Sequence, residues 1–126
     1  GDAPWSMRAS KKVIVTVEEI VDRSVIGRDP NRTIIPAYKV AAVIREPFGS
    51  HPKHIQGFYD VDRDFIFKYI RESKDLDTWR TFMDEWVYGV EDRTAYIEKF
   101  IRVFGIKKFL ELKAKDMSSG SVNYGY

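Results

Sequence analysis

Apolar residues in the first half of the chain fall into two short continuous runs. Val13 to Val17 is β-branched at every position, and Tyr38 to Ile44 is nearly all apolar. Runs of this length and composition predict β-strands. Because neither run alternates with polar residues, both are typical of strands buried on both faces of a parallel sheet.

Weaker signals surround these two strands. Residues 1–10 indicate an incoming turn and a short helix, and Arg23 to Gly27 forms a short amphipathic piece. Thr33 to Pro36 predicts a short extended segment that is stopped by its proline. We therefore expect two or three strands in this half.

From Asp62 the apolar spacing changes to that of helices. Asp62 precedes one helical face, Asp75 or Asp77 is a candidate cap for the next helix, and a last helix starts at about Asp92. Gly105 is expected to end that helix, with another turn or two from Ile106 to Lys113. The residues predicted to face inward recur at helical spacing: Phe65, Ile66, Tyr69, Ile70, Trp79, Phe82, Met83, Trp86, Val87, Val90, Tyr96, Ile97, Phe100, Ile101 and Phe104.

The order of these elements predicts an α/β fold with a partial, open, mostly parallel sheet and a helical C-terminal section. We expect residues 1–115 to form part of one domain, and the Ser- and Gly-rich residues 116–126 to form a flexible tail. Strands buried on both faces need neighbouring strands and covering helices. The chain offers few of either, so its pattern resembles the later part of something larger.

Composition narrows the function classes. The 126 residues are 44% hydrophobic and 32% charged, with a net charge of +2 that is too small to indicate a nucleic-acid partner. Without cysteine, the chain has no disulfide, thiolate metal site or cysteine nucleophile. No apolar run reaches membrane-spanning length and no signal-peptide pattern opens the chain, so we expect a cytoplasmic protein without a membrane partner.

The candidate site is the loop from Arg45 to Pro52. Pro47 and Pro52 stiffen it, and loops at strand ends commonly carry the site of an α/β protein. The Ser50 hydroxyl, together with the amides of Gly49 and Ser50, is suited to donate to an oxyanion or thioester carbonyl. His51 is a candidate acid, base or hydrogen-bond donor. The alternative is a tight turn in which the histidine orders its own loop.

Two adjacent carboxylates, Glu18 and Glu19, follow the first strand. Because they point to opposite sides, at most one can face a pocket at the carboxyl end of the strand. The alternative is a solvated acid that pairs with Arg23 or Arg28. A metal site is not expected, because Pro52 interrupts the spacing of the two histidines, His51 and His54.

Taken together, several collinear segments resemble the second half of the α subunit of family I CoA-transferases, and most of all the α (A) subunits of the glutaconate CoA-transferase group. The resemblance covers roughly residues 1–104. The segments that carry it are Val13 to Asp22, Arg32 to Pro36, Val40 to Ile44, Pro47 to Pro52, Tyr59-Asp60 and Asp84 to Val90.

This resemblance implies an open α/β fold of the CoA-transferase type, with the active site between an α and a β subunit. It implies a ping-pong reaction in which coenzyme A is a substrate, no cofactor is bound, and CoA passes from an acyl-CoA to a carboxylic acid such as a dicarboxylate. The nucleophilic glutamate is expected on the β subunit, so no catalytic residue is expected here. Gly49, Ser50, His51, Glu18 and Glu19 are the expected lining of the substrate and CoA site.

Three further expectations follow. The chain alone should be inactive, because the glutamate context of the β part and the Gly-rich N-terminal segment of the α part are absent from it. The chain is expected to be an oligomer, because its strands lack flanking neighbours. A CoA-thioester hydrolase subunit of the same fold and a non-catalytic interaction module stay open as alternatives.

Overall fold

A computed structural model of the chain describes residues 3–33 and 35–115. The chain divides into two compact units, residues 1–49 and residues 50–126. The prediction that residues 1–115 belong to one domain stays a prediction, and the predicted flexible tail, residues 116–126, lies outside the described residues.

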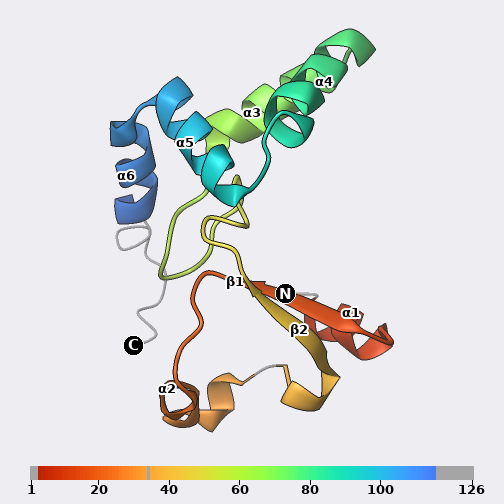
Figure 1. Ribbon diagram of the computed structural model, residues 1–126, viewed down its shortest axis with the longest axis vertical. Helices are drawn as coiled ribbons and strands as arrows, with labels where there is room; N and C mark the ends of the chain where they lie inside the picture. The colour runs from red at the N-terminus through yellow and green to blue at the C-terminus, as the bar shows by residue number, and fades with distance from the viewer. Residues whose placement is uncertain (1–2, 34, 116–126) are drawn as a thin grey trace. The chain divides into compact units, whose positions relative to one another are not determined.

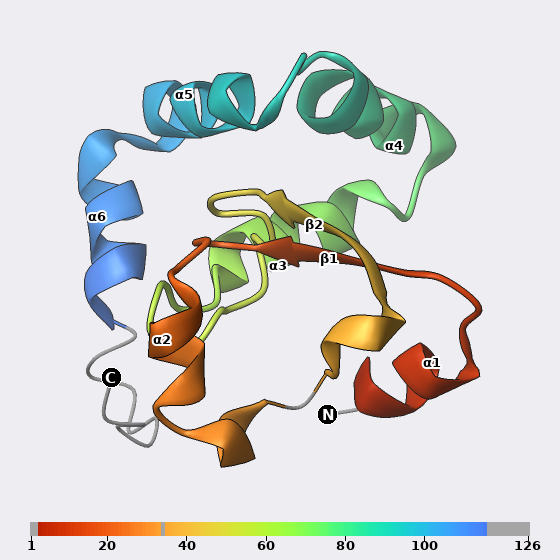
Figure 2. The ribbon, with the colours of Figure 1, turned by 60° about the horizontal axis from the view of Figure 1, so that its bottom comes forward.

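The first unit is built on a pair of parallel strands (Figure 1). Strand β1 pairs with β2 from Val13 opposite Val40 to Val17 opposite Arg45, with a register shift after Val13. Figure 2 shows the connection leaving β1, passing through α2 and returning to β2. Its elements are α1 (Ala3–Ala9), β1 (Val13–Val17), α2 (Arg23–Gly27), the 3₁₀ turns Pro30–Arg32 and Ala37–Lys39, and β2 (Val40–Arg45).

The predicted first strand is confirmed residue for residue, and the second begins two residues later than predicted. Ala37 to Lys39 forms a 3₁₀ turn because the amide of Lys39 donates to the carbonyl of Pro36. The predicted third extended segment forms no strand at its described residues. Thr33 and Pro36 do have extended backbone dihedrals, and position 34 is outside the described residues.

The prediction that both strands are buried on both faces is wrong for these residues. Ile14 is 65% exposed and Ile44 is 46% exposed. In the register, Ile14 is opposite Ala42 and Thr16 is opposite Ile44, so these side chains share one face of the sheet. A continuous β-branched run favours a strand, but its burial depends on what covers the sheet, and this face is uncovered in the unit.

The second unit is a set of helices that begin where the sequence predicts (Figure 2). The carboxylates of Asp62, Asp75 and Asp92 each accept hydrogen bonds from backbone amides of the first turn, which is worth about 1 kcal/mol per cap. The helices are α3 (Arg63–Glu72), α4 (Leu76–Met83), a π-helical turn (Asp84–Tyr88), α5 (Arg93–Phe104) and α6 (Ile106–Lys115).

Aromatic side chains from these helices form the core of the second unit. Phe65 packs edge-on against Trp86 at 5.0 Å between ring centroids, and Trp86 stacks on Phe104 at 5.7 Å. The predicted apolar stripe from Trp79 to Val90 is found only in part, because Val87 is 47% exposed, and the α-helix that carries it ends at Met83 and continues as the π-helical turn. The inward position predicted for Tyr69 and Ile70 is wrong, since they are 44% and 46% exposed.

Glycines mark the two changes of direction after that stripe. A Cβ on Gly89 would lie 2.3 Å from the carbonyl oxygen of Asp84, so only glycine fits the end of the π-helical turn. Gly105 ends α5 with φ of 88°, as predicted, and α6 follows it to Lys115, longer than expected. Across the described residues, no helix combines the length and apolarity needed to cross a membrane.

Candidate functional site

The residues predicted to line the site are divided between the two units. Glu18, Glu19 and Gly49 belong to the first unit, and Ser50 and His51 belong to the second. The structure brings Glu18 and Gly49 into direct contact, and it places Ser50 and His51 in a separate hydrogen-bonded group.

Glu18 follows β1 directly, and its side chain accepts hydrogen bonds from the turn that follows β2. Its Oε2 accepts a hydrogen bond from the amide of Phe48 at 2.8 Å, and its Oε1 accepts one from the amide of Gly49 at 3.2 Å. The Gly49 amide also donates to the carbonyl of Glu46 at 3.0 Å. Hydrogen bonds to an ionised carboxylate are stronger than those between neutral groups, so this contact ties the turn to the end of β1.

Gly49 is required by the tight path of the turn. A Cβ built on it would lie 2.6 Å from the backbone oxygen of Glu46, closer than carbon and oxygen approach without a shift. Its neighbour Phe48 has φ of 59°, a left-handed conformation that is unusual for a residue other than glycine. Glu19, next to Glu18, is exposed, as expected for adjacent residues that point to opposite sides.

Ser50 opens the second unit. Its amide donates to the hydroxyl of Tyr59 at 2.9 Å, and Tyr59 is fully buried. The amides of Gly49 and Ser50, which the sequence offered as oxyanion donors, therefore both donate within the chain. The role of the Ser50 hydroxyl toward a substrate stays a prediction.

His51 is enclosed in the second unit, with no exposed side-chain surface. Its Nδ1 lies 2.7 Å from the Tyr96 hydroxyl and its Nε2 lies 3.2 Å from Asp62 Oδ2. The rings of Phe65 and Phe100 approach its ring edge-on, each at 4.9 Å between centroids. These contacts match the alternative interpretation, in which the histidine orders its own loop.

Asp62 is the charged centre of this group. Its Oδ1 caps α3 by accepting from the amide of Phe65 at 3.2 Å, and it lies 3.3 Å from the Nζ of Lys108 on α6. Lys108 also donates to Asp64 at 2.6 Å. The aspartate therefore links the loop at His51 to two helices.

Burial and charge set the protonation states in this group. Burial lowers the pKa of His51, and the positive charges of Arg93 and Lys108 lower it further, although Asp62 opposes them. Burial by itself raises the pKa of Asp62, but hydrogen bonds from His51 and Phe65 and the charge of Lys108 outweigh it, so the pKa falls.

The hydrogen-bond directions follow from these protonation states. An ionised carboxylate only accepts, so the Nε2–H of neutral His51 donates to Asp62. Nδ1 then accepts from the Tyr96 hydroxyl, whose pKa is raised by burial. Both ring nitrogens are therefore engaged within the chain, and the role of His51 as an acid or base stays a prediction.

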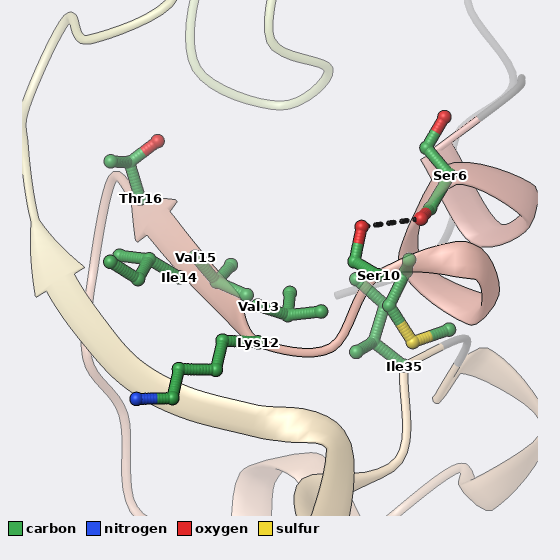
Figure 3. A pocket seen from close by; sticks show the side chains of 9 residues that line it. Ser6, Ser10, Lys12, Val13, Ile14, Val15, Thr16 and Ile35 are labelled. Atoms are coloured by element: carbon green, nitrogen blue, oxygen red, sulfur yellow. Dashed lines mark hydrogen bonds between the residues drawn. The ribbon is translucent and has the colours of Figure 1, made fainter.

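A hollow of about 420 Å³ lies elsewhere in the first unit, between α1 and β1 (Figure 3). In Figure 3 the Ser10 hydroxyl donates to the carbonyl of Ser6 at 2.8 Å. The residues lining the hollow are Ser6, Met7, Ser10, Lys12, Val13, Ile14, Val15, Thr16 and Ile35. None of them was predicted as a site residue. In the described part of the chain, no cluster of three or more His, Asp or Glu could hold a metal ion.

Sequence reasoning missed the partners of the predicted residues. The sequence marks Tyr59 only as part of a family-like segment and Tyr96 only as an inward-facing residue. In the structure the Tyr59 hydroxyl accepts from the Ser50 amide, and the Tyr96 hydroxyl bonds His51. Asp62 was found as a helix start, because a carboxylate before an apolar helical face is a visible cap signal. The other pairings join residues that are far apart in sequence, and no local pattern indicates them.

Comparisons with known proteins identify homologues over most of the chain. It is 37% identical over 105 residues to the A subunit of glutaconate CoA-transferase from Acidaminococcus fermentans, covering 83% of this chain and 32% of that protein. It is 34% identical over 91 residues to the A subunit of 3-oxoadipate CoA-transferase from Pseudomonas knackmussii, covering 72% of this chain and 32% of that protein. No family model matches.

A solved structure confirms the fold. The crystal structure of glutaconate coenzyme A-transferase from Acidaminococcus fermentans matches with a TM-score of 0.76 and 36% identity, over 85% of this chain and 32% of that chain. The predicted resemblance to the A subunits and the predicted α/β fold are therefore confirmed. The chain spans about a third of the length of these two curated relatives.

Proposed function

We propose that this chain, which is homologous over most of its length to the A subunits of CoA-transferases, forms part of such a subunit. The complete protein would move CoA between an acyl-CoA and a carboxylic acid, for which a dicarboxylate is our first candidate. The observation that carries the proposal is the 37% identity over 105 residues to the glutaconate CoA-transferase relative. The structural match at a TM-score of 0.76 supports it.

The covalent chemistry in this proposal belongs to a partner β subunit. A glutamate carboxylate there attacks the thioester carbonyl of the acyl-CoA and expels the CoA thiolate, which leaves a mixed anhydride. The thiolate then attacks the glutamyl carbonyl and releases the first carboxylic acid. The carboxylate of the second acid then attacks the glutamyl-CoA thioester, which forms a new mixed anhydride and expels the CoA thiolate. The thiolate attacks the acyl carbonyl of this anhydride, which gives the new acyl-CoA and frees the glutamate carboxylate.

This chain's contribution in the proposal is the turn that follows β2. The carboxyl ends of β1 and β2 lie at the same edge of the parallel pair, where α/β proteins place their binding crevices. Gly49 is at this edge, and the backbone continues directly into Ser50 and His51. The buried hydrogen bonds of His51 support a role in holding this segment, with substrate contact left to the Ser50 hydroxyl.

The experiment that tests the proposal is a replacement within a working enzyme. The homologous segment of the Acidaminococcus glutaconate CoA-transferase is replaced by this chain, and the resulting chimeric subunit is combined with the enzyme's β subunit. We expect the chimera to restore CoA transfer that is lost when the segment is deleted, and the 126-residue chain alone to show no turnover. Turnover by the chain alone would contradict the assignment of the nucleophile to the partner.

A further inference from the structure

Hydrogen bonds beyond the strand ladder connect the ends of β1 and β2. The amide of Glu46 donates to the carbonyl of Val17 at 2.7 Å, which extends the ladder one residue past the strands. The chain then reverses direction at Pro47 and Phe48. The Gly49 amide completes this turn by donating a hydrogen bond to the carbonyl of Glu46. The next residue after β1 is Glu18, so its carboxylate starts beside this turn.

The turn has a conformation that its sequence does not favour. A positive φ at the third position is normally supplied by glycine, but that position is Phe48, with φ of 59°. A conformation of this kind persists only where the surroundings hold it. In the first unit, the Glu18 carboxylate holds this conformation, because it accepts hydrogen bonds at 2.8 Å and 3.2 Å from the consecutive amides of Phe48 and Gly49.

Consecutive amides that converge on one carboxylate form a small concave anion site. Here the anion is a side chain of the same chain. We propose that Glu18 is a positioning residue, which fixes the turn after β2 by filling this concave site, rather than a group that contacts the substrate. Its effect on CoA transfer rests on the function proposed above, whereas its effect on the turn does not.

The first measurement is hydrogen exchange of backbone amides in the 126-residue chain, followed by NMR. Glu18→Gln keeps the size of the side chain but replaces one acceptor oxygen by a donor, and Glu18→Ala removes both acceptors. We expect exchange at Phe48 to accelerate about tenfold or more in Glu18→Ala, and less in Glu18→Gln. Gly49 should respond less, because it keeps its bond to Glu46.

Asp22→Asn is the matched control. Asp22 also accepts a backbone amide in this unit, that of Ser24 at 2.8 Å, but it is exposed and caps α2. This variant should leave exchange at Phe48 unchanged. Unchanged exchange at Phe48 in both Glu18 variants would overturn the proposal.

The second measurement separates positioning from direct contact, using the chimeric subunit with its β subunit. We expect Glu18→Gln to lower kcat about tenfold or more, with a smaller change in KM, because a displaced turn misplaces the reacting groups. Asp22→Asn should leave both unchanged. Slower transfer without faster exchange at Phe48 would show that Glu18 acts on the substrate and not through the turn, and would overturn the proposal. Faster exchange with unchanged kcat would confirm that Glu18 holds the turn and would overturn only its effect on CoA transfer.

A wrong function assignment can be distinguished from a wrong role for Glu18. If the unsubstituted chimera assembles with its β subunit but transfers no CoA, the function assignment is wrong. The exchange measurement on the chain still decides whether Glu18 holds the turn.

Discussion

The Nδ1 atom of His51 lies 2.7 Å from the hydroxyl oxygen of Tyr96, a residue 45 positions further along the chain. Together with the contact to Asp62, this bond fastens the segment after the β2 turn to α3 and α5. The histidine that sequence singles out as a candidate acid or base is thus buried and bonded at both ring nitrogens. The first two predictions follow from it.

Tyr96→Phe should destabilise the chain by about 1–2 kcal/mol. The substitution keeps the ring and removes the hydroxyl, and with it the donor to the buried Nδ1 of His51. Urea denaturation followed by tryptophan fluorescence measures the change. Tyr88→Phe is the control, because Tyr88 is 74% exposed. Equal losses in the two variants would show that the buried bond contributes nothing.

The free energy of unfolding should rise as the pH increases towards 6.5, the usual pKa of histidine. The folded chain keeps His51 neutral below that value because its pKa is lowered. The unfolded chain therefore binds more protons there, so stability is lost as the pH falls. Denaturation midpoints between about pH 5 and pH 8 should show this slope.

His51→Asn should remove that slope. The other histidine provides the control: His54 is exposed, and His54→Asn should keep the slope. Asp62, whose pKa is also lowered, acts in a separate window, since its contribution is lost only when the pH falls below its usual value of 3.8. A slope near neutral pH that survives His51→Asn would assign the effect to another group.

Gly49→Ala should destabilise the first unit by about 1–3 kcal/mol, because the new methyl group would lie 2.6 Å from the Glu46 oxygen and the turn has to shift. Gly27→Ala is the matched control in the same unit. Nothing lies within 4 Å of the Cβ it would add, so it should be neutral or slightly stabilising. Thermal denaturation of both variants tests the contrast, and equal midpoints would contradict it.

Self-association is expected through the uncovered face of the sheet. Ile14 and Ile44 share that face and are 65% and 46% exposed, and an exposed apolar patch commonly marks an interface. Light scattering over a concentration series should show a rising mass that Ile14→Lys reduces. Ile26→Lys, at a 54% exposed residue of α2, should not reduce it. A single monomeric mass at all concentrations would refute the expectation.

Local sequence signals predicted much of the fold. Val13 to Val17 is a strand because every residue is β-branched, and three helices begin after the carboxylates of Asp62, Asp75 and Asp92. These signals are carried by neighbouring residues. The π-helical turn after Met83 was not predicted, because the apolar residues from Trp79 to Val90 keep α-helical spacing in the sequence.

The candidate site was predicted only as a set of residues, without its contacts. Glu18 and Gly49 were correctly placed at the ends of neighbouring strands, since parallel strands bring their carboxyl ends to one edge. That Glu18 would bond the amides of the turn depends on the φ of Phe48, which no residue pattern indicates. The bond from His51 to Tyr96 depends on helix packing, which the apolar pattern of α5 permits but does not specify.

The measurement that tests the central claim most directly is transfer of CoA to an isotopically labelled carboxylic acid by the chimeric subunit with its β subunit. Mass spectrometry follows the label. The account predicts labelled acyl-CoA that forms only when both subunits and the labelled acid are present. Release of CoA without any labelled acyl-CoA, by a chimera that is shown to assemble, would contradict transfer and indicate hydrolysis of the thioester instead.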